Sequence, residues 1–466
     1  MLHPDRLLPA DPSTRLIARD LFASIEKLPI ISPHGHTEPR WFAENLPFPD
    51  PAQLLIVPDH YVTRMLVSQG VDLTELGVPR RDGGKVETDG RTIWRRFASN
   101  YHLFRGTPSR MWLDTTLETV FGVTESLSSI TADAVYDRIA AQLATPQFLP
   151  RALFERFNIE IIATTDSAID PLDWHKRIGE SGWTGRVVPT YRPDSIIDPD
   201  KPSFQADLDT LADLTGCDTQ SWQGYLDAHR KRRAFFKSMG ATASDHGHPS
   251  ALTIDLRPAA AEALFERVRR GRADASEREQ FRGQMLTEMA AMSVDDGLVL
   301  QIHPGSWRNH SPDMFAAFGP DKGFDIPRPT EYVAALKPLL DRFGLNKQLT
   351  IIVFTLDETA YSRELAPLAG VYPALRLGPP WWFFDSPEGM MRFREIATET
   401  AGFYNTVGFN DDTRAFCSIP ARHDMARRID CAFVARLVAE HRLGANEAFE
   451  VVKDLAYTLA KKAYRL

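Results

Sequence analysis

The stretch LPIISPHGH, residues 28–36, decides the fold predicted for this chain. It is a short apolar run that ends at a proline and continues into a pair of histidines, which is typical of a buried parallel strand. Because buried helices contain similar runs, the pattern alone leaves a helix open. The same pattern recurs seven times along the chain, at residues 159–166, 186–194, 238–246, 297–305, 349–358, 372–378 and 403–414.

Helix-like stretches separate most of these apolar runs. Residues 259–293 form one, and residues 329–344 form another, with Pro329 and Thr330 suited to its start and Gly344 to its end. Strands that alternate with helices indicate βαβ units and a parallel sheet. Eight such strands predict an α/β fold of the (β/α)8 TIM barrel type, while an open, doubly wound sheet is the alternative.

The first two predicted strands are separated by far more chain than one crossover helix needs. Residues 37–156 are helical and loop-like, rich in aromatic side chains, and no Ser/Gly-rich linker sets them apart. We therefore expect a barrel formed by residues 1–36 and 157–466, with residues 37–156 as a helical insertion after the first strand. Residues 424–466 are expected to be helices that close the barrel.

Composition excludes several classes of protein. The 466 residues contain 54 Lys and Arg against 62 Asp and Glu, a formal charge of −8, which argues against broad binding of nucleic acid or of an anionic membrane. No apolar run is long enough to span a bilayer, and the N-terminus lacks the apolar core of a signal peptide. The three cysteines fit no zinc-ribbon or CxxC spacing. These features predict a cytoplasmic enzyme.

Two polar motifs follow the first and the last predicted strands. In His34-Gly35-His36, residues i and i+2 point the same way, so both imidazoles can face one transition-metal ion, although a polar histidine pair needs no metal. In Asp411-Asp412-Thr413-Arg414, an aspartate can act as a ligand or a base, and Arg414 can hold an oxyanion. The alternative for the second motif is a solvated acidic turn.

Other predicted strands also end in groups suited to an active site. Arg192, Asp245 and His303 follow the third, fourth and fifth strands. The carboxyl ends of barrel strands build the active site, so these side chains are expected to converge, although each alone can be structural. The sequence contains no P-loop, no GxGxxG after a strand and no GxSxG elbow.

With these motifs in order, the chain resembles the uronate isomerase (glucuronate isomerase) family of the amidohydrolase superfamily over essentially its whole length. The resemblance is carried by HGH from residue 34, PDHYVTRMLVSQGV from 58, TTDSAIDPLDWH from 164, VVPTYRPD from 187, ASDHG from 243, QIHPGSWRN from 301, GPPWWFFD from 378, VGFNDDTR from 407 and ARHDMARRI from 421. It implies a distorted (β/α)8 barrel with an inserted helical region. It also implies an aldose–ketose isomerase that interconverts D-glucuronate with D-fructuronate and D-galacturonate with D-tagaturonate.

The resemblance also implies a set of site residues. One divalent metal ion, commonly zinc, is expected on His34, His36 and Asp412, where Asp412 is chosen over Asp411 by its spacing to Arg414. The fourth strand ends in Ser244-Asp245-His246 and lacks the lysine that bridges two metals in related hydrolases, so a single metal is expected. His60, Tyr61, Arg192, Asp245 and Arg414 match positions that line the substrate site. His303 matches a histidine of strand five, as either a metal ligand or a substrate contact.

Isomerisation moves a proton between C2 and C1 through an enediol. Tyr61 is our hypothesis for the base at C2, with its phenolate favoured by Arg414 or the metal. Arg192 and Arg414 would supply cationic hydrogen bonds, Asp412 would assist ring opening or relay a proton, and Asp245 would orient substrate hydroxyls. The expected partner is a hexuronate substrate, with no nucleic acid and no membrane, and a homo-oligomer is expected. The alternatives are a metal-dependent hydrolase on the same barrel and a non-catalytic sugar-acid binding protein.

Overall fold

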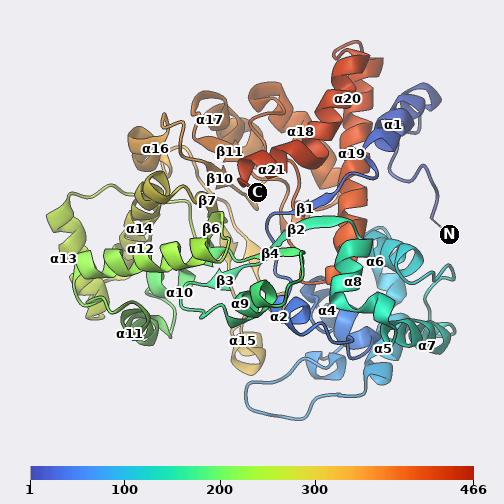
Figure 1. Ribbon diagram of the computed structural model, residues 1–466, viewed down its shortest axis with the longest axis horizontal. Helices are drawn as coiled ribbons and strands as arrows, with labels where there is room; N and C mark the ends of the chain where they lie inside the picture. The colour runs from blue at the N-terminus through green and yellow to red at the C-terminus, as the bar shows by residue number, and fades with distance from the viewer. Residues whose placement is uncertain (1) are drawn as a thin grey trace.

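The computed structural model describes residues 2–466 and has an α/β fold (Figure 1). All the pairings are parallel except that of β8 with β9. The strands are β1 (Ile30–Ser32), β2 (Ile159–Ala163), β3 (Asp166–Ser167), β4 (Arg186–Val188), β5 (Tyr191–Arg192), β6 (Ala243–His246), β7 (Val299–Ile302), β8 (Ser306–Trp307), β9 (Ile326–Pro327), β10 (Ile351–Val353) and β11 (Leu375–Leu377).

The parallel strands form two sheets rather than the single closed sheet that the sequence predicted. One sheet has the order β1-β2-β4, and the other has the order β11-β10-β7-β6-β5-β3. Backbone hydrogen bonds continue between them, from the Thr164 amide to the Val188 carbonyl at 2.9 Å and from the Asp166 amide to the Thr190 carbonyl at 3.1 Å. β2 with β3, and β4 with β5, are therefore successive pieces of two interrupted strands.

The eighth predicted strand, residues 403–414, is mostly irregular. It forms one isolated parallel bridge, from Thr406 to Leu377, and further along it is hydrogen-bonded to the segment after β1. The Asp412 amide donates to the His34 carbonyl at 3.3 Å, and the His36 amide donates to the Thr413 carbonyl at 3.0 Å. A regular strand is interrupted here because Gly408 and Asp412 have positive φ values of 77° and 40°.

Helices surround the strands, and among residues 2–466 none is long and apolar enough to cross a membrane. The α-helices are α1 (Pro12–Ile25), α2 (Pro39–Glu44), α3 (Pro51–Leu55), α4 (His60–Val67), α5 (Gly90–Ser99), α6 (Pro108–Thr119), α7 (Ala132–Leu143), α8 (Pro150–Arg156), α9 (Asp173–Glu180), α10 (Asp194–Ile197), α11 (Phe204–Thr215), α12 (Trp222–Ser238), α13 (Pro258–Arg269), α14 (Ala275–Asp296), α15 (Pro312–Phe318), α16 (Lys337–Phe343), α17 (Ala366–Val371), α18 (Pro387–Ala401), α19 (Ile419–Ala439), α20 (Ala445–Lys453) and α21 (Leu459–Ala463). Short 3₁₀ helices cover Leu73–Leu76, Tyr101–Phe104, Pro146–Phe148, Trp382–Phe384 and Phe416–Ser418, and π-helical turns cover Tyr361–Leu365 and Asp454–Thr458.

Two predicted helices were wrong in their extent. Residues 259–293 form two helices, because Gly271 adopts a positive φ of 64° and Asp274 then starts α14 with a capping box. Residues 329–344 are helical only from Lys337, where Pro338 fits the first turn. The preceding segment is held by tertiary contacts instead, such as the Tyr332 amide donating to Glu364 Oε2 at 2.7 Å.

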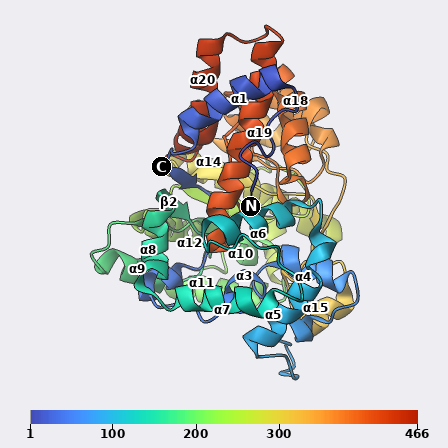
Figure 2. The same ribbon diagram turned by 90° about the vertical axis from the view of Figure 1, so that its right-hand side faces the viewer.

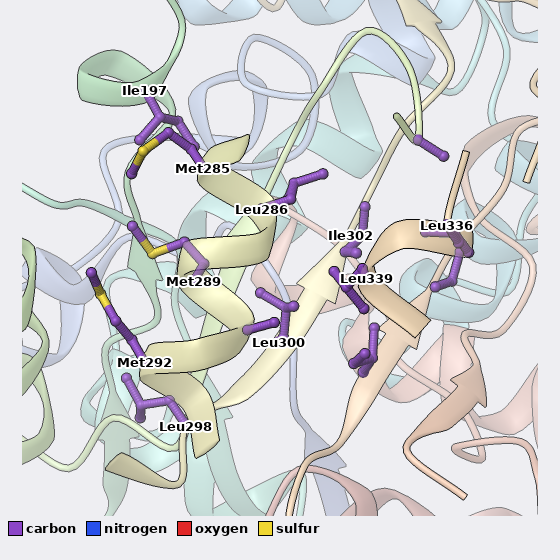
Figure 3. Close-up of a cluster of buried hydrophobic side chains, with 14 of the residues drawn as sticks. Ile197, Met285, Leu286, Met289, Met292, Leu298, Leu300, Ile302, Leu336 and Leu339 are labelled. Atoms are coloured by element: carbon purple, nitrogen blue, oxygen red, sulfur yellow. The ribbon is translucent and has the colours of Figure 1, made fainter. Parts of the chain in front are cut away.

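The largest core cluster packs helices against the six-stranded sheet. Figure 3 shows Leu286 of α14 on the side of the helix that faces β7, and Met289 on the opposite side. Leu300 and Ile302 of β7 are fully buried in the same cluster. α14 therefore fixes the position of β7, whose carboxyl end leads to His303.

The C-terminal helices cover the amino-terminal ends of the strands. Ala460 packs in one cluster with strand residues of the first sheet, and Tyr464 packs in another with strand residues of the second sheet. Arg465 donates to the carbonyls of Gly297 and Gln348, which precede β7 and β10. Figures 1 and 2 also show α1 beside α19, and the two helices pack together. The carboxyl ends of the strands are thus left to form the site.

Among residues 37–156 the structure has helices and no strand. In Figure 1 most of them, including α8, lie at the lower right, next to the β1-β2-β4 sheet. Their core is shared with the rest of the chain, because Ile30, Ile162 and Val187 belong to the same buried cluster as the insertion's aromatic side chains. Residues 37–156 therefore share one core with β1, β2 and β4.

Candidate active site

A single cavity of about 1040 Å³ lies at the carboxyl ends of the strands. All nine site residues predicted from the sequence line it, and two of them, His60 and Tyr61, come from α4. The nine residues are His34, His36, His60, Tyr61, Arg192, Asp245, His303, Asp412 and Arg414. Segments separated by hundreds of residues therefore meet where the parallel strands end, as the barrel pattern leads one to expect.

Two histidines and one aspartate form a group suited to a metal ion. The Nε2 atoms of His34 and His36 lie 3.4 Å and 3.3 Å from Oδ1 of Asp412. The two imidazole rings stand edge to face, with their centroids 5.6 Å apart. Asp412 reaches this position from a left-handed backbone conformation, which is uncommon for a residue with a side chain.

Unpaired buried atoms show that this donor set fits a cation. Neither carboxylate oxygen of Asp412 has a hydrogen-bond partner among the described residues, and the same is true of Asp245 Oδ2 and His303 Nε2. The remaining side-chain atoms of these two residues are paired with each other, because His303 Nδ1 lies 2.6 Å from Asp245 Oδ1. A second possible metal group comprises His34, Asp245 and His303. Buried polar atoms without hydrogen bonds are costly, and a bound cation removes that cost.

The electrostatics of these groups favour ionised carboxylates. Burial acts to raise the pKa of Asp412, but the His34 and His36 rings lower that pKa well below its ordinary value. Burial acts on Asp245 in the same direction, and His303 and Arg192 lower the pKa of Asp245 well below its ordinary value. Burial also lowers the pKa of His36 to about 4, so its imidazole is neutral at pH 7 and free to act as a ligand.

Two arginines line the cavity together with the metal group. Arg192, in β5, donates to Asp194 Oδ2 at 2.8 Å and lies 3.5 Å from Asp245 Oδ2. Arg414 lies 3.4 Å from Asp321 Oδ2. Both guanidinium groups are only partly exposed, with side-chain exposures of 23% and 33%, so each can exchange part of its pairing for an anionic ligand.

The insertion presents His60 and Tyr61 at the first turn of α4. Asp59 caps this helix by accepting a hydrogen bond from the Tyr61 amide at 2.8 Å. Burial lowers the pKa of His60 to about 3 and raises the pKa of Tyr61 well above its ordinary value. The arginines that act to lower the pKa of Tyr61 are Arg422 and Arg64, and no comparable effect of Arg414 on this phenol is resolved.

Several residues of this region escaped the sequence analysis. Asp321, which pairs with Arg414, adopts a positive φ of 58° in a loop bounded by Gly319 and Gly323, and only the turn-forming composition of that loop marks it. Asp385 and Arg422 form a buried ion pair at 3.0 Å behind Tyr61. Nothing in the local pattern of either segment signals that these charges are buried.

The choice between the two aspartates of the last motif has a structural counterpart. Asp412 lines the cavity, whereas Asp411 is fully buried and its Oδ2 lies 3.2 Å from Nε2 of His423 in α19. Trp381 and Trp382 also line the cavity. The three cysteines form no disulfide.

Comparison with known families identifies the chain. The family model described as Glucuronate isomerase matches residues 13–464. The chain belongs to this family. The family's uronate isomerase from Mesorhizobium japonicum is 69% identical over 466 residues, covering 100% of the chain and 99% of that relative, and the one from Brucella canis is 63% identical over 465 residues, covering 100% of both. The resemblance found in the sequence is therefore confirmed, and the chain is an isomerase.

Solved structures of the family support the fold. The glucuronate isomerase from Caulobacter crescentus superposes with a TM-score of 0.98 at 59% identity, covering 100% of this chain and 97% of that chain. A putative metal-dependent hydrolase from Lactobacillus casei superposes with a TM-score of 0.53 at 13% identity, covering 96% of this chain and 97% of that chain. At that identity the second likeness concerns the fold alone.

Proposed function

We propose that the chain interconverts D-glucuronate with D-fructuronate and D-galacturonate with D-tagaturonate, by proton transfer between C2 and C1 through an enediol. The observation that carries this proposal is the meeting of a metal-type donor set, two arginines and a tyrosine in one cavity of about 1040 Å³. Membership of the glucuronate isomerase family supports the same reaction. The preferred substrate class is a hexuronate, whose carboxylate can pair with Arg192 or Arg414.

The metal site proposed is one divalent ion, zinc by expectation, held by His34, His36 and Asp412. Two imidazoles and a carboxylate are a donor set typical of zinc. When bound, the cation supplies positive charge that holds the substrate carboxylate and its neighbouring hydroxyl. His303 remains either a further ligand or a substrate contact, and its unpaired Nε2 supports both.

The chain's own residues would carry the remaining steps. Arg192 and Arg414 donate hydrogen bonds to substrate oxygens and stabilise the charge of the enediolate. Tyr61 is the proposed base at C2, and its phenolate requires nearby positive charge because burial raises the pKa of the phenol. Asp412 assists ring opening or relays a proton, while His60 and Asp245 orient the substrate.

A metal-dependent hydrolase is the second reading of the same donor set. Its support is the fold-level likeness to the hydrolase from Lactobacillus casei, at 13% identity. Fold similarity does not carry function, and the relatives at 63–69% identity are named uronate isomerases. Isomerisation is therefore favoured.

We also propose an organisation for the whole chain. The strand order, together with the bridge at Thr406 and the hydrogen bonds between residues 34–36 and 412–413, supports a distorted (β/α)8 barrel. Residues 1–36 and 157–466 would form this barrel, and residues 37–156 would be the insertion that contributes to the active site. A cytoplasmic location and a homo-oligomeric state complete the proposal.

Proton NMR of both uronates in D₂O, with enzyme and added zinc, tests the function directly. A ketose product is the expected result, and solvent deuterium at an exchangeable carbon would support the enediol route. Product identity is the primary measurement, because internal return of the proton reduces the label. If neither uronate is converted by the zinc-loaded protein, the proposed reaction is wrong.

A further inference from the structure

Arg422 is a fully buried charge that does not line the cavity. It contacts two of the cavity's walls from behind, the wall formed by the strand ends and the wall formed by residues 37–156. Its side chain extends from α19 and is 1% exposed. Its Nη1 donates to Asp385 Oδ2 at 3.0 Å and to the backbone carbonyl of Asp411 at 3.1 Å. Its Nε donates to Ser418 Oγ at 3.3 Å. The guanidinium therefore holds the residue that immediately precedes Asp412.

The same guanidinium also contacts the insertion. Its central carbon lies 3.7 Å from the centroid of the Trp112 ring, and 5.4 Å from that of Tyr61. Trp112, from α6, meets the Tyr61 ring edge to face, with the centroids 5.8 Å apart. The close contact of the guanidinium restrains the Trp112 ring, and the edge-to-face contact of Trp112 extends that restraint to the Tyr61 ring.

The cost of burying this ion pair points to a role other than stability. The side chains of Arg422 and Asp385 are 1% and 4% exposed, and desolvating two charges to this extent costs about as much as their attraction returns. Well-packed apolar residues of similar volume often replace such a pair without loss of stability. What apolar residues cannot supply is a forked donor that bonds a carbonyl while stacking on a ring.

We propose that Arg422 is a positioning residue, which fixes the Tyr61 ring relative to the Asp412 carboxylate by joining Trp112 to the Asp411 carbonyl. Asp385 holds the guanidinium in this orientation. The inference rests on the proposed function, because Tyr61 and Asp412 are the groups whose separation matters for proton transfer. A misplacement of about 1 Å in such a pair can reduce turnover by about 10²-fold.

The chain offers a matched control on the same helix. Arg394 of α18 and Asp430 of α19 form another buried ion pair, with side-chain exposures of 5% and 8% and a shortest contact of 2.6 Å. Neither residue lines the cavity. The double variants R422M/D385L and R394M/D430L therefore remove equivalent buried pairs, and only the first removes the link between the two walls.

The test compares these variants as zinc-loaded holoenzymes. We expect R422M/D385L to fold and to lose about 10²-fold in kcat, with KM and bound zinc within about threefold of wild type. R422K keeps the charge without the planar fork, so its kcat should fall by about tenfold. R394M/D430L should keep kcat within about twofold per folded molecule. A wild-type kcat in R422M/D385L, or an equal loss in the control, would overturn the proposal.

Two further readings keep the outcome decisive. If R422M/D385L does not fold, R422K decides alone: a loss in kcat at unchanged KM supports the proposal, and an unchanged kcat overturns it. If the wild-type protein converts no uronate, the proposed function fails, and crystal structures of wild type and R422K decide the positioning role separately. Displacement of the Tyr61 ring from the Asp412 carboxylate supports it, and an unchanged arrangement contradicts it.

Discussion

The wall of the cavity made by strand ends differs from the wall made by the helical insertion in what holds its side chains. On the strand wall, His34 and Asp412 sit on segments joined by backbone hydrogen bonds, and His303 is paired with Asp245 at 2.6 Å. On the insertion wall, Tyr61 is held by a helix cap and by packing against aromatic rings and arginines.

This difference separates two requirements of the reaction. A metal ion needs ligand atoms at fixed distances, which a hydrogen-bonded sheet provides. A proton-transfer group needs a defined distance to the substrate, which the helix cap and the aromatic packing provide for Tyr61. Changes on the strand wall should therefore affect metal binding, while changes on the insertion wall should affect turnover alone.

Replacing Asp412 should give the largest effect, because it removes a proposed metal ligand from the strand wall. Asp412→Ala removes the carboxylate that both histidines face at 3.3–3.4 Å, so zinc binding should weaken and turnover should fall by at least about 10⁴-fold. Zinc per chain is measured by plasma mass spectrometry beside kcat. Full zinc occupancy with turnover near that of wild type would contradict the assignment of Asp412 as a ligand.

Replacing Tyr61 sharpens the comparison from the insertion side. Tyr61→Phe keeps the ring packed against Trp112 and removes only the hydroxyl, so zinc content should stay the same while kcat falls by about 10²–10⁴-fold. Steady-state kinetics with the NMR product assay measures this. Near-native turnover would exclude Tyr61 as the base, and a loss of zinc would show that the two walls are not independent.

Asp245→Asn should give a smaller effect on the strand wall. The amide keeps the shape of the side chain but loses the negative charge that pairs with His303 and Arg192. Partners that orient a ligand or a substrate-binding group typically contribute about 10–100-fold, so kcat/KM should fall by that amount. The split between KM and kcat shows whether Asp245 acts through substrate binding. No change in either constant would show that Asp245 contributes neither to substrate binding nor to turnover.

The sequence predicts the strand wall better than the rest of the site, for a physical reason. His34, Arg192 and Asp245 each follow an apolar run, and parallel strands bring such positions to one edge whatever the packing details. No such geometric rule applies to residues 37–156, so His60 and Tyr61 were predicted as site residues only through the family resemblance. Arg422 lies among other charged residues in α19, where local pattern cannot distinguish a buried charge from a solvated one.

The fold shows the same division between local pattern and tertiary context. Seven of the eight apolar runs contain strands, because burial on both faces selects the residues that the pattern detects. The eighth run and the segment before α16 departed from prediction where backbone conformation or tertiary hydrogen bonds took precedence. Positive φ values at Gly408 and Asp412 interrupt the eighth run. The segment before α16 is held by Glu364, which accepts a hydrogen bond from the Tyr332 amide.

Neutral histidines behind the strand wall give the smallest predicted effect, on stability rather than turnover. Burial, with Arg233 nearby, lowers the pKa of His229 to about 3, and its Nδ1 lies 2.7 Å from the Tyr191 hydroxyl. The unfolded chain binds a proton at this histidine below about pH 6.5, so stability is fully present above that pH and falls as pH decreases toward 3. This amounts to about 2 kcal/mol between pH 6.5 and pH 5. The unfolding free energy of His229→Gln, measured with urea, should fall less than that of wild type between pH 6.5 and pH 5, by that amount, and should have the same pH dependence as wild type near pH 8. Its kcat should stay within about twofold of wild type. An unchanged loss of stability at acid pH would show that His229 does not cause it.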